Sequence, residues 1–121
     1  MGPAEPPYVH GHDLLDGKVV VVTAAAGTGI GSATARRCAE EGAILVISDA
    51  HERRLGEAAG SIAEIAGVRP LVVPCDVTVE EQVQALFEAA TEEHGRIDVL
   101  VNNAGLGGES LLALSLIHIS E

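Results

Sequence analysis

Residues Val19 to Gly31, with the sequence VVVVTAAAGTGIG, decide the fold of this chain. Four consecutive valines predict a strand that is buried on both faces, because a parallel strand covered by helices has no polar side. The glycines Gly27, Gly29 and Gly31 then allow a tight turn and let a ligand approach without a Cβ in the way. The following residues, SATARRCAEEG, are typical of a helix. N–H groups of the loop and of the helix start would converge on one point, which favours an anion such as a phosphate.

Outward from this loop, the chain alternates between expected strands and helices with short connections. The expected strands are residues 18–23, 43–48, 71–74 and 97–101, and the expected helices cover 32–41, 52–66 and a third segment that ends at Gly95. Thr78 and Glu81 match a capping box at the start of that third helix. In a capping box, the hydroxyl and a carboxylate three residues later each bind the backbone N–H of the other residue. The alternation predicts an α/β fold with right-handed crossovers and a doubly wound parallel sheet, which stops after about the fourth strand.

Charge and composition exclude several functional classes. The formal net charge is −11, from 18 acidic and 7 basic residues, and such a surface is a poor partner for nucleic acid. No apolar run approaches the roughly 20 residues that span a bilayer, so we expect no membrane association. Cys38 and Cys75 lie at no metal-ligand spacing and are expected to be reduced packing residues of a cytoplasmic protein, and we expect no metal site.

Polar residues follow the ends of the other strands. Asp49 and the pair Asn102 and Asn103 come directly after the second and fourth expected strands, and Asp76 follows the third after Cys75. Because the carboxyl ends of parallel strands share one edge, these side chains should gather where ligands bind such sheets. Asp76 and the asparagines also suit turns, and both interpretations stay open.

The acid at the end of the second strand bears on the choice of nucleotide. A carboxylate at Asp49 can accept both hydroxyls of an adenosine ribose and would repel a 2′-phosphate. This favours NAD over NADP. Arg53 and Arg54 stand nearby and leave NADP open.

The loop AAAGTGIG, Asp49, the CDV of Cys75 to Val77 and the NNAG of Asn102 to Gly105 together resemble the short-chain dehydrogenase/reductase family. The resemblance covers roughly Leu14 to Gly108. It implies a Rossmann fold and an NAD(P)-dependent oxidoreductase, which moves a hydride between nicotinamide and the carbonyl or alcohol carbon of a small molecule. It also implies that the full-length parent is a homo-oligomer, with 3-oxoacyl, 3-hydroxyacyl or steroid-like compounds as common substrates of the family.

The resemblance assigns the residues of the glycine loop. Thr28, Gly29 and Ile30 would face the pyrophosphate. The family's usual loop has a glycine directly after the threonine, whereas here Ala24 follows Thr23 and one extra residue is present. The first turn of the loop is therefore altered.

The resemblance also assigns the remaining contacts. Asp49 would bind the adenosine ribose, Asp76 and Val77 the adenine, and Asn103 to Gly105 would border the nicotinamide-side ribose and steady the central strand. The expected cofactor-binding residues are Gly27, Thr28, Gly29, Ile30, Gly31, Asp49, Asp76, Val77, Asn103, Ala104 and Gly105.

The family's catalytic residues have no counterpart in this sequence. Family members use a serine and a Tyr-x-x-x-Lys pair downstream of NNAG, with the tyrosine as general acid or base and the lysine lowering its pKa. Tyr8 and Lys18 are the single tyrosine and the single lysine of the chain, and both precede the cofactor loop. We therefore expect no catalytic residue and an inactive chain as it stands.

The end of the sequence departs from the pattern. Residues 114–121, LSLIHISE, resemble the translated end of a transposon-based sequencing adapter, and we hypothesise that they derive from one, with a natural short paralogue as the alternative. We divide the chain into a flexible N-terminal extension (1–13), a partial NAD(P)-binding Rossmann domain (14–113) and a non-native tail (114–121). Two other functions stay open, an S-adenosylmethionine-dependent methyltransferase and a non-catalytic nucleotide-binding module.

Overall fold

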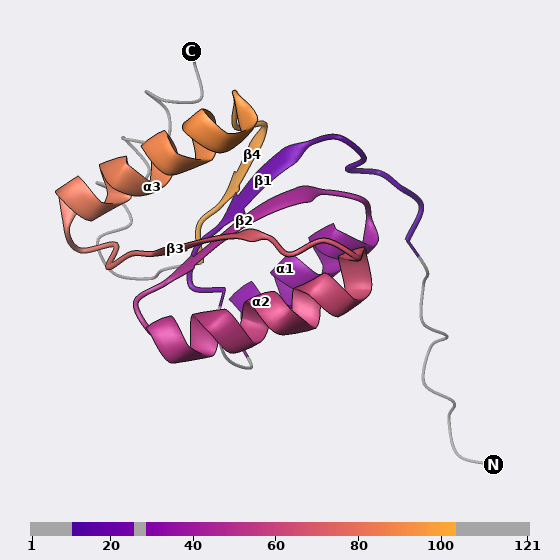
Figure 1. The fold of residues 1–121 in the computed structure, drawn as a ribbon, viewed down its shortest axis with the longest axis horizontal. Helices are drawn as coiled ribbons and strands as arrows, with labels where there is room; N and C mark the ends of the chain where they lie inside the picture. The colour runs from indigo at the N-terminus through magenta and orange to yellow at the C-terminus, as the bar shows by residue number, and fades with distance from the viewer. Residues whose placement is uncertain (1–10, 26–28, 104–121) are drawn as a thin grey trace.

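The computed structural model describes residues 11–25 and 29–103, so Gly27, Thr28, Ala104, Gly105 and the tail 114–121 lie outside the described residues. Strands and helices alternate along the chain (Figure 1). Their bounds are β1 Val19–Val22, α1 Ile30–Glu40, β2 Ile44–Asp49, α2 Glu52–Ala66, β3 Leu71–Pro74, α3 Glu80–His94 and β4 Val99–Val101. The expected α/β alternation is confirmed, and each strand end lies within two residues of its prediction.

The strands form one parallel sheet in the order β3-β2-β1-β4. Val21 in β1 pairs with Val46 on one side and with Leu100 on the other. The strand order therefore reverses beside β1, because the chain builds outward through β2 and β3 and then returns to place β4 on the opposite flank. In doubly wound sheets, ligands bind at this reversal, beyond the carboxyl ends of the strands.

The four valines of β1 are divided between two cores. All four are at most 1% exposed, and successive side chains of a strand point to opposite faces. Val20 and Val22 pack in a cluster with residues of α1 and α2, whereas Val19 and Val21 pack with residues of α3. Figure 1 shows the same layering, with α1 and α2 on one face of the sheet and α3 on the other. The prediction of a central, doubly covered strand is confirmed.

The helices end where the sequence predicts. Gly67 after α2 and Gly95 after α3 adopt left-handed backbone conformations, with φ of 75° and 79°. Each glycine donates its N–H to the carbonyl four residues earlier, which gives that carbonyl a hydrogen-bond partner at the end of the helix. A residue with a Cβ would be strained in this left-handed conformation.

The predicted capping box at α3 is wrong. Val79 is the N-cap residue, and no side chain caps the helix. The hydroxyl and the N–H of Thr78 instead donate to Oδ1 of Asp76, at 2.6 and 3.0 Å. A charged acceptor two residues earlier competes with the helix for the threonine, because short polar side chains readily form such local turns.

The segment before β1 is held against α1 by a buried acid. The Glu41 carboxylate accepts the N–H groups of His12 and Leu14, at 2.7 and 3.2 Å, and the Arg37 guanidinium at 2.8 Å. Glu41 is 5% exposed. The two backbone N–H groups, with Arg37 as a smaller contribution, hold the pKa of this carboxyl below its usual value.

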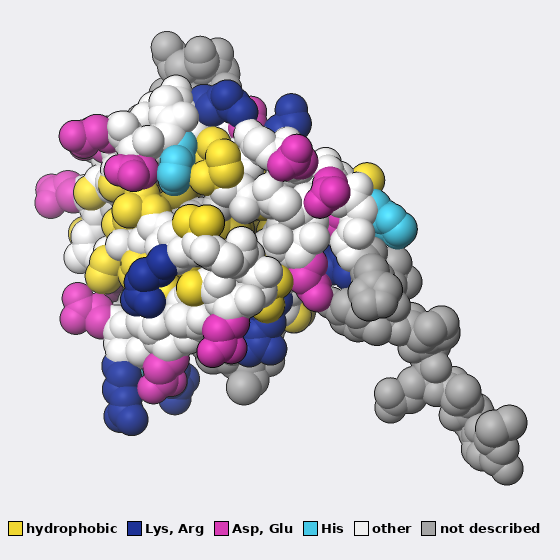
Figure 2. Space-filling view, turned by 45° about the vertical axis from the view of Figure 1, so that its right-hand side comes forward, with side chains coloured by type: hydrophobic (Ala, Val, Ile, Leu, Met, Phe, Trp, Pro, Cys, Tyr) yellow, Lys and Arg dark blue, Asp and Glu magenta, His cyan; other side chains and the backbone are white. Residues whose placement is uncertain are grey.

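Acidic and apolar side chains share the molecular surface. Figure 2 shows Asp and Glu side chains spread around one face, with apolar side chains gathered between them.

A cavity of about 260 Å³ lies at the amino ends of β2 and β3, where Leu45, Ile62 and Leu71 are among its lining residues. Within residues 11–25 and 29–103, no helix has the length and apolar character that crossing a membrane requires.

Candidate functional site

The carboxyl ends of β1 and β4 are tied together at the strand-order reversal. Thr23 is fully buried and donates its N–H to the Val101 carbonyl at 3.1 Å. Asn103 donates its N–H to the Thr23 hydroxyl at 3.1 Å and its side-chain amide to the Thr23 carbonyl at 3.3 Å. The Thr23 hydroxyl in turn contacts Oδ1 of Asn102 at 3.2 Å. Both asparagines therefore fix the end of the central strand, which is the positioning that the sequence predicts for Asn103.

Gly31 lets α1 pack directly on the end of β1. A Cβ at this position would lie 2.0 Å from the Ala24 carbonyl oxygen and 3.2 Å from that of Thr23. Ala24, whose carbonyl makes the closer of these contacts, has a left-handed conformation with φ of 51°. A left-handed alanine costs about 1–2 kcal/mol, and the alanine here stands where the family pattern has glycine.

The start of α1 suits an anion. Gly29 is its N-cap residue, no side chain caps it, and no acidic residue lies in the first turn. Among the residues that the structure describes, none has an atom within 4 Å of a Cβ built on Gly29, so these residues leave the backbone open on this side. Ile30, which the family resemblance expects to face the pyrophosphate, exposes 78% of its surface.

The three residues expected around adenosine line a single cavity. Asp49, Asp76 and Val77 border a space of about 140 Å³, together with Ala24, Ala50 and Cys75. Oδ1 of Asp49 accepts the N–H of His51 at 2.9 Å, which orients the carboxylate at the end of β2. The structure therefore brings together residues that are separated by more than two dozen positions in the sequence.

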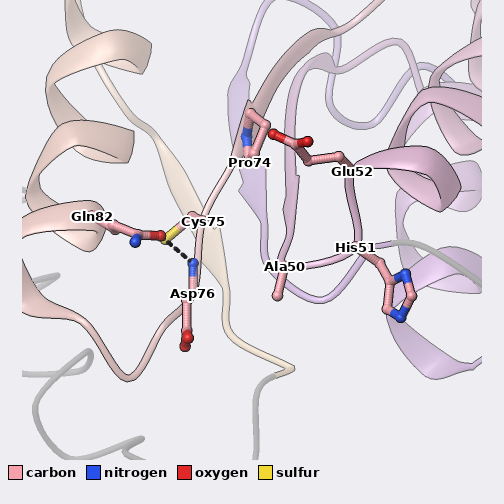
Figure 3. A pocket seen from close by; sticks show the side chains of 7 residues that line it. All are labelled: Ala50, His51, Glu52, Pro74, Cys75, Asp76 and Gln82. Atoms are coloured by element: carbon pink, nitrogen blue, oxygen red, sulfur yellow. Dashed lines mark hydrogen bonds between the residues drawn. The ribbon is translucent and has the colours of Figure 1, made fainter.

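A larger cavity of about 430 Å³ adjoins the first and shares Ala50, Cys75 and Asp76 with it. Figure 3 shows Gln82 approaching from α3, opposite the residues at the start of α2. Oε1 of Gln82 accepts the backbone N–H of Asp76 at 2.8 Å (Figure 3). Sequence reasoning missed this contact, and the only available signal was an amide side chain in the first turn of α3.

The Asp76 carboxylate is ordered by its own turn. The hydroxyl of Thr78, followed by its N–H, lowers the pKa of Asp76, so this side chain is a carboxylate near neutral pH. The turn-forming interpretation of Asp76 is thus confirmed. Its exposure and its place beside the cavity leave it available for a ligand as well.

Asp98 is a second residue that sequence reasoning missed. Its Oδ2 accepts the Val19 N–H and the Arg96 guanidinium, each at 2.8 Å. These two contacts, with Arg96 the stronger, lower the pKa of Asp98. Asp98 thereby ties the amino end of β4 to β1, so the central strand is anchored to β4 at both ends.

The cysteines are free thiols inside the fold. Cys38 is 8% exposed and Cys75 is 3% exposed. Burial raises the pKa of both thiols, which keeps them protonated and unreactive. In the part of the chain that the structure describes, no group of His, Cys, Asp and Glu side chains is arranged to hold a metal ion.

Comparison with known proteins agrees with this geometry. The family model described as Enoyl-(Acyl carrier protein) reductase matches residues 24–121. The chain belongs to the short-chain dehydrogenase/reductase family. A (5R,7aS)-5-hydroxy-7a-methyl-1-oxo-2,3,5,6,7,7a-hexahydro-1H-indene-carboxyl-CoA reductase of Mycobacterium tuberculosis is 62% identical over 108 residues, which are 89% of this chain and 41% of that protein.

Solved structures of short-chain dehydrogenases/reductases share the fold. A short chain dehydrogenase from Mycobacterium smegmatis is 60% identical, with a TM-score of 0.78 over 87% of this chain and 43% of that one. L-sorbose reductase from Gluconobacter frateurii, complexed with NADPH and L-sorbose, is 45% identical with a TM-score of 0.71 over 77% of this chain and 35% of that one. The chain thus spans about two fifths of such relatives. These matches are dehydrogenases and reductases, so the methyltransferase alternative gains no support from them.

Proposed function

We propose that this chain forms the cofactor-binding part of an NAD(P)-dependent oxidoreductase, which transfers a hydride between nicotinamide and a carbonyl or alcohol carbon. The observation that carries the proposal is the joint lining of one cavity by Asp49, Asp76 and Val77, beside a helix start without acidic residues. The residues present fit a dinucleotide. Backbone N–H groups at a helix start bind the phosphates of a dinucleotide, and carboxylates accept hydrogen bonds from its hydroxyl and amino groups.

In this proposal, different residues at the carboxyl edge of the sheet bind different parts of the cofactor. Gly29 to Gly31 hold the pyrophosphate together with Gly27 and Thr28, and Asp49 accepts the hydroxyls of the adenosine ribose. Asp76 and Val77 border the adenine. Asn103 to Gly105 border the nicotinamide-side ribose, for which the bonds of Asn103 to Thr23 supply a fixed base. The bound cofactor would supply or take up the hydride.

NAD is the proposed cofactor, with NADP as the second possibility. Asp49 stands at the end of β2, where its charge opposes a 2′-phosphate. Arg53 and Arg54 both border a neighbouring cavity with His51 and Glu57, at the start of α2. Arg53 lies 3.6 Å from Glu57 and its side chain is 91% exposed, so either arginine could swing toward a 2′-phosphate.

For the complete enzyme we propose a hydroxyacyl or oxoacyl thioester, or a steroid-like alcohol, as substrate. The relative from Mycobacterium tuberculosis, whose name describes a ring-bearing hydroxy acyl-CoA, supports this choice.

The chain contains no tyrosine or lysine after the cofactor loop, and we propose that it binds cofactor without turnover. A cytoplasmic homo-oligomer is proposed for the parent, with the buried free thiols supporting the location. The non-native origin of residues 114–121 is likewise a proposal, which sequencing of the source locus tests.

Fluorescence titration of the whole chain with NADH and NADPH tests the proposal. We expect saturable binding with a preference for NADH. Asp49→Ala should reduce that preference at least about tenfold, since it removes both the ribose acceptor and the repulsion of a 2′-phosphate. Glu64→Gln, which removes one exposed charge from α2, is the matched control and should bind like the parent. Binding of neither nucleotide, or of S-adenosylmethionine in their place, would overturn the proposal.

A further inference from the structure

We propose that Gln82 is a positioning residue for the adenine end of the cofactor site. The proposal rests on the function proposed above, because it concerns how Asp76 and Val77 are held. The backbone N–H of Asp76 donates to Oε1 of Gln82 at 2.8 Å (Figure 3). Only the oxygen of the amide can accept from an N–H, so the orientation of the Gln82 side chain follows from this bond.

Gln82 is itself mounted on a rigid element. Its own N–H donates to the Val79 carbonyl at 3.0 Å, in the first turn of α3. The next residue, Val83, is 1% exposed and belongs to the core cluster that also contains Cys75. Movement of the Gln82 backbone would therefore require movement of α3 against the sheet, whereas the Gln82 side chain is exposed and is held in place by its bond to Asp76.

The bond from Gln82 completes the alignment of the two acids. Cys75 donates its N–H to the Asp49 carbonyl at 3.1 Å, which fixes the end of β3 to the end of β2. At the next residue, the Asp76 N–H donates to Oε1 of Gln82, which approaches from α3. Thr78 then orients the Asp76 carboxylate through Oδ1, which leaves Oδ2 without a partner among the described residues. Asp49 and Asp76 thus face the same cavity at a separation set by these bonds.

This contact differs from an ordinary helix cap. In a capping box, the side chain at the third helical position reaches back to the N–H of the N-cap residue. Gln82 occupies that third position, yet it reaches past the N-cap Val79 to Asp76. The bond therefore fixes a residue of the proposed ligand site in addition to the start of α3.

Two substitutions in the whole chain separate these roles. Gln82→Met keeps the length of the side chain and removes the acceptor, whereas Gln82→Glu keeps an acceptor oxygen. NADH and reduced nicotinamide mononucleotide are titrated by their fluorescence, and AMP by displacement of NADH. Loss of one positioning hydrogen bond should weaken NADH and AMP by the same factor in Gln82→Met, about three- to tenfold. The affinity for reduced nicotinamide mononucleotide, which has no adenine, should not change, and Gln82→Glu should bind NADH within about threefold of the parent.

The outcomes distinguish this inference from the proposed function. If Gln82→Met binds AMP as the parent does, or loses affinity for all three ligands equally, Gln82 has only a structural role and the inference is wrong. If the unsubstituted chain binds none of the three ligands, the proposed function fails and the inference fails with it. If Gln82→Met loses affinity only for the adenine-containing ligands NADH and AMP while Gln82→Glu keeps it, that result supports both the inference and the proposed function.

Discussion

Substitution of Gly31 by alanine tests how β1 and α1 meet. The added Cβ would lie 2.0 Å from the Ala24 carbonyl oxygen and 2.8 Å from its carbon, both of which are main-chain atoms that no side-chain rotation can move. The helix would have to shift by about 1 Å to bring the closer contact to the 3.0 Å that real Cβ atoms observe. Overpacking of this kind costs about 1–3 kcal/mol, and two main-chain partners place it near the upper limit.

The expected net loss is smaller than the steric cost. Alanine in place of glycine inside a helix contributes up to about 1 kcal/mol, which leaves a net loss of about 2 kcal/mol in the free energy of unfolding. For a domain of this size, each 1 kcal/mol shifts Tm by about 4–8 °C. We therefore expect Tm to fall by about 8–16 °C.

Urea denaturation of the whole chain, followed by far-UV circular dichroism, measures this loss. Gly56→Ala in α2 is the matched control, because a Cβ there meets nothing within 4 Å and alanine should raise stability by up to about 1 kcal/mol. If Gly31→Ala proves as stable as the parent, α1 does not pack on the Ala24 carbonyl as described, and the reasoning about the loop is refuted.

Two further substitutions probe the site and the N-terminal anchor. Gly29→Ala should lower the urea midpoint only slightly, because its Cβ would meet none of the described residues and the loss is that of a weaker N-cap, yet it should lower NADH affinity at least about tenfold by filling the approach to the helix start; unchanged affinity would place the phosphates elsewhere. Glu41 has a lowered pKa when folded, so its stabilising contribution is complete above its usual value of 4.5 and is lost as the pH falls through the lower folded value. The urea midpoint of Glu41→Gln should accordingly lie below that of the parent at neutral pH, and the gap should narrow as the pH falls below 4.5; a gap independent of pH would show that the charge of Glu41 is not what holds the segment before β1.

Local sequence patterns predict most of this fold. The valine run has no polar face and therefore belongs at the centre of a sheet, and Gly67 and Gly95 stand where helices must end in left-handed turns. The acids and asparagines that follow the strands gather at one edge because the sheet is parallel. These features depend on short-range periodicity, which a sequence displays directly.

The contacts that sequence reasoning missed depend on folded geometry, one of them over a long range and two of them within six positions of the chain. Asp98 meets Val19 across 79 positions, and nothing near either residue announces the partner. Gln82 lies six positions after Asp76, and its side chain reaches past the N-cap Val79 to the Asp76 N–H, which the usual capping pattern does not predict. Thr78 fits the local motif of a helix cap, in which its hydroxyl would accept a backbone N–H of the helix, but the helix begins one residue later and the hydroxyl donates to Asp76 instead. Which of these local arrangements forms is decided by the folded structure, which no spacing rule contains.

Amide chemical shifts of the whole chain during a titration with NADH test the central claim most directly. We predict that the perturbed amides cluster at the carboxyl edge of the sheet, at Gly29 to Gly31, Asp49, Asp76 and Asn103. Perturbations that cluster instead at the amino edge, around Leu45, Ile62 and Leu71, or no perturbation at saturating NADH, would contradict the account.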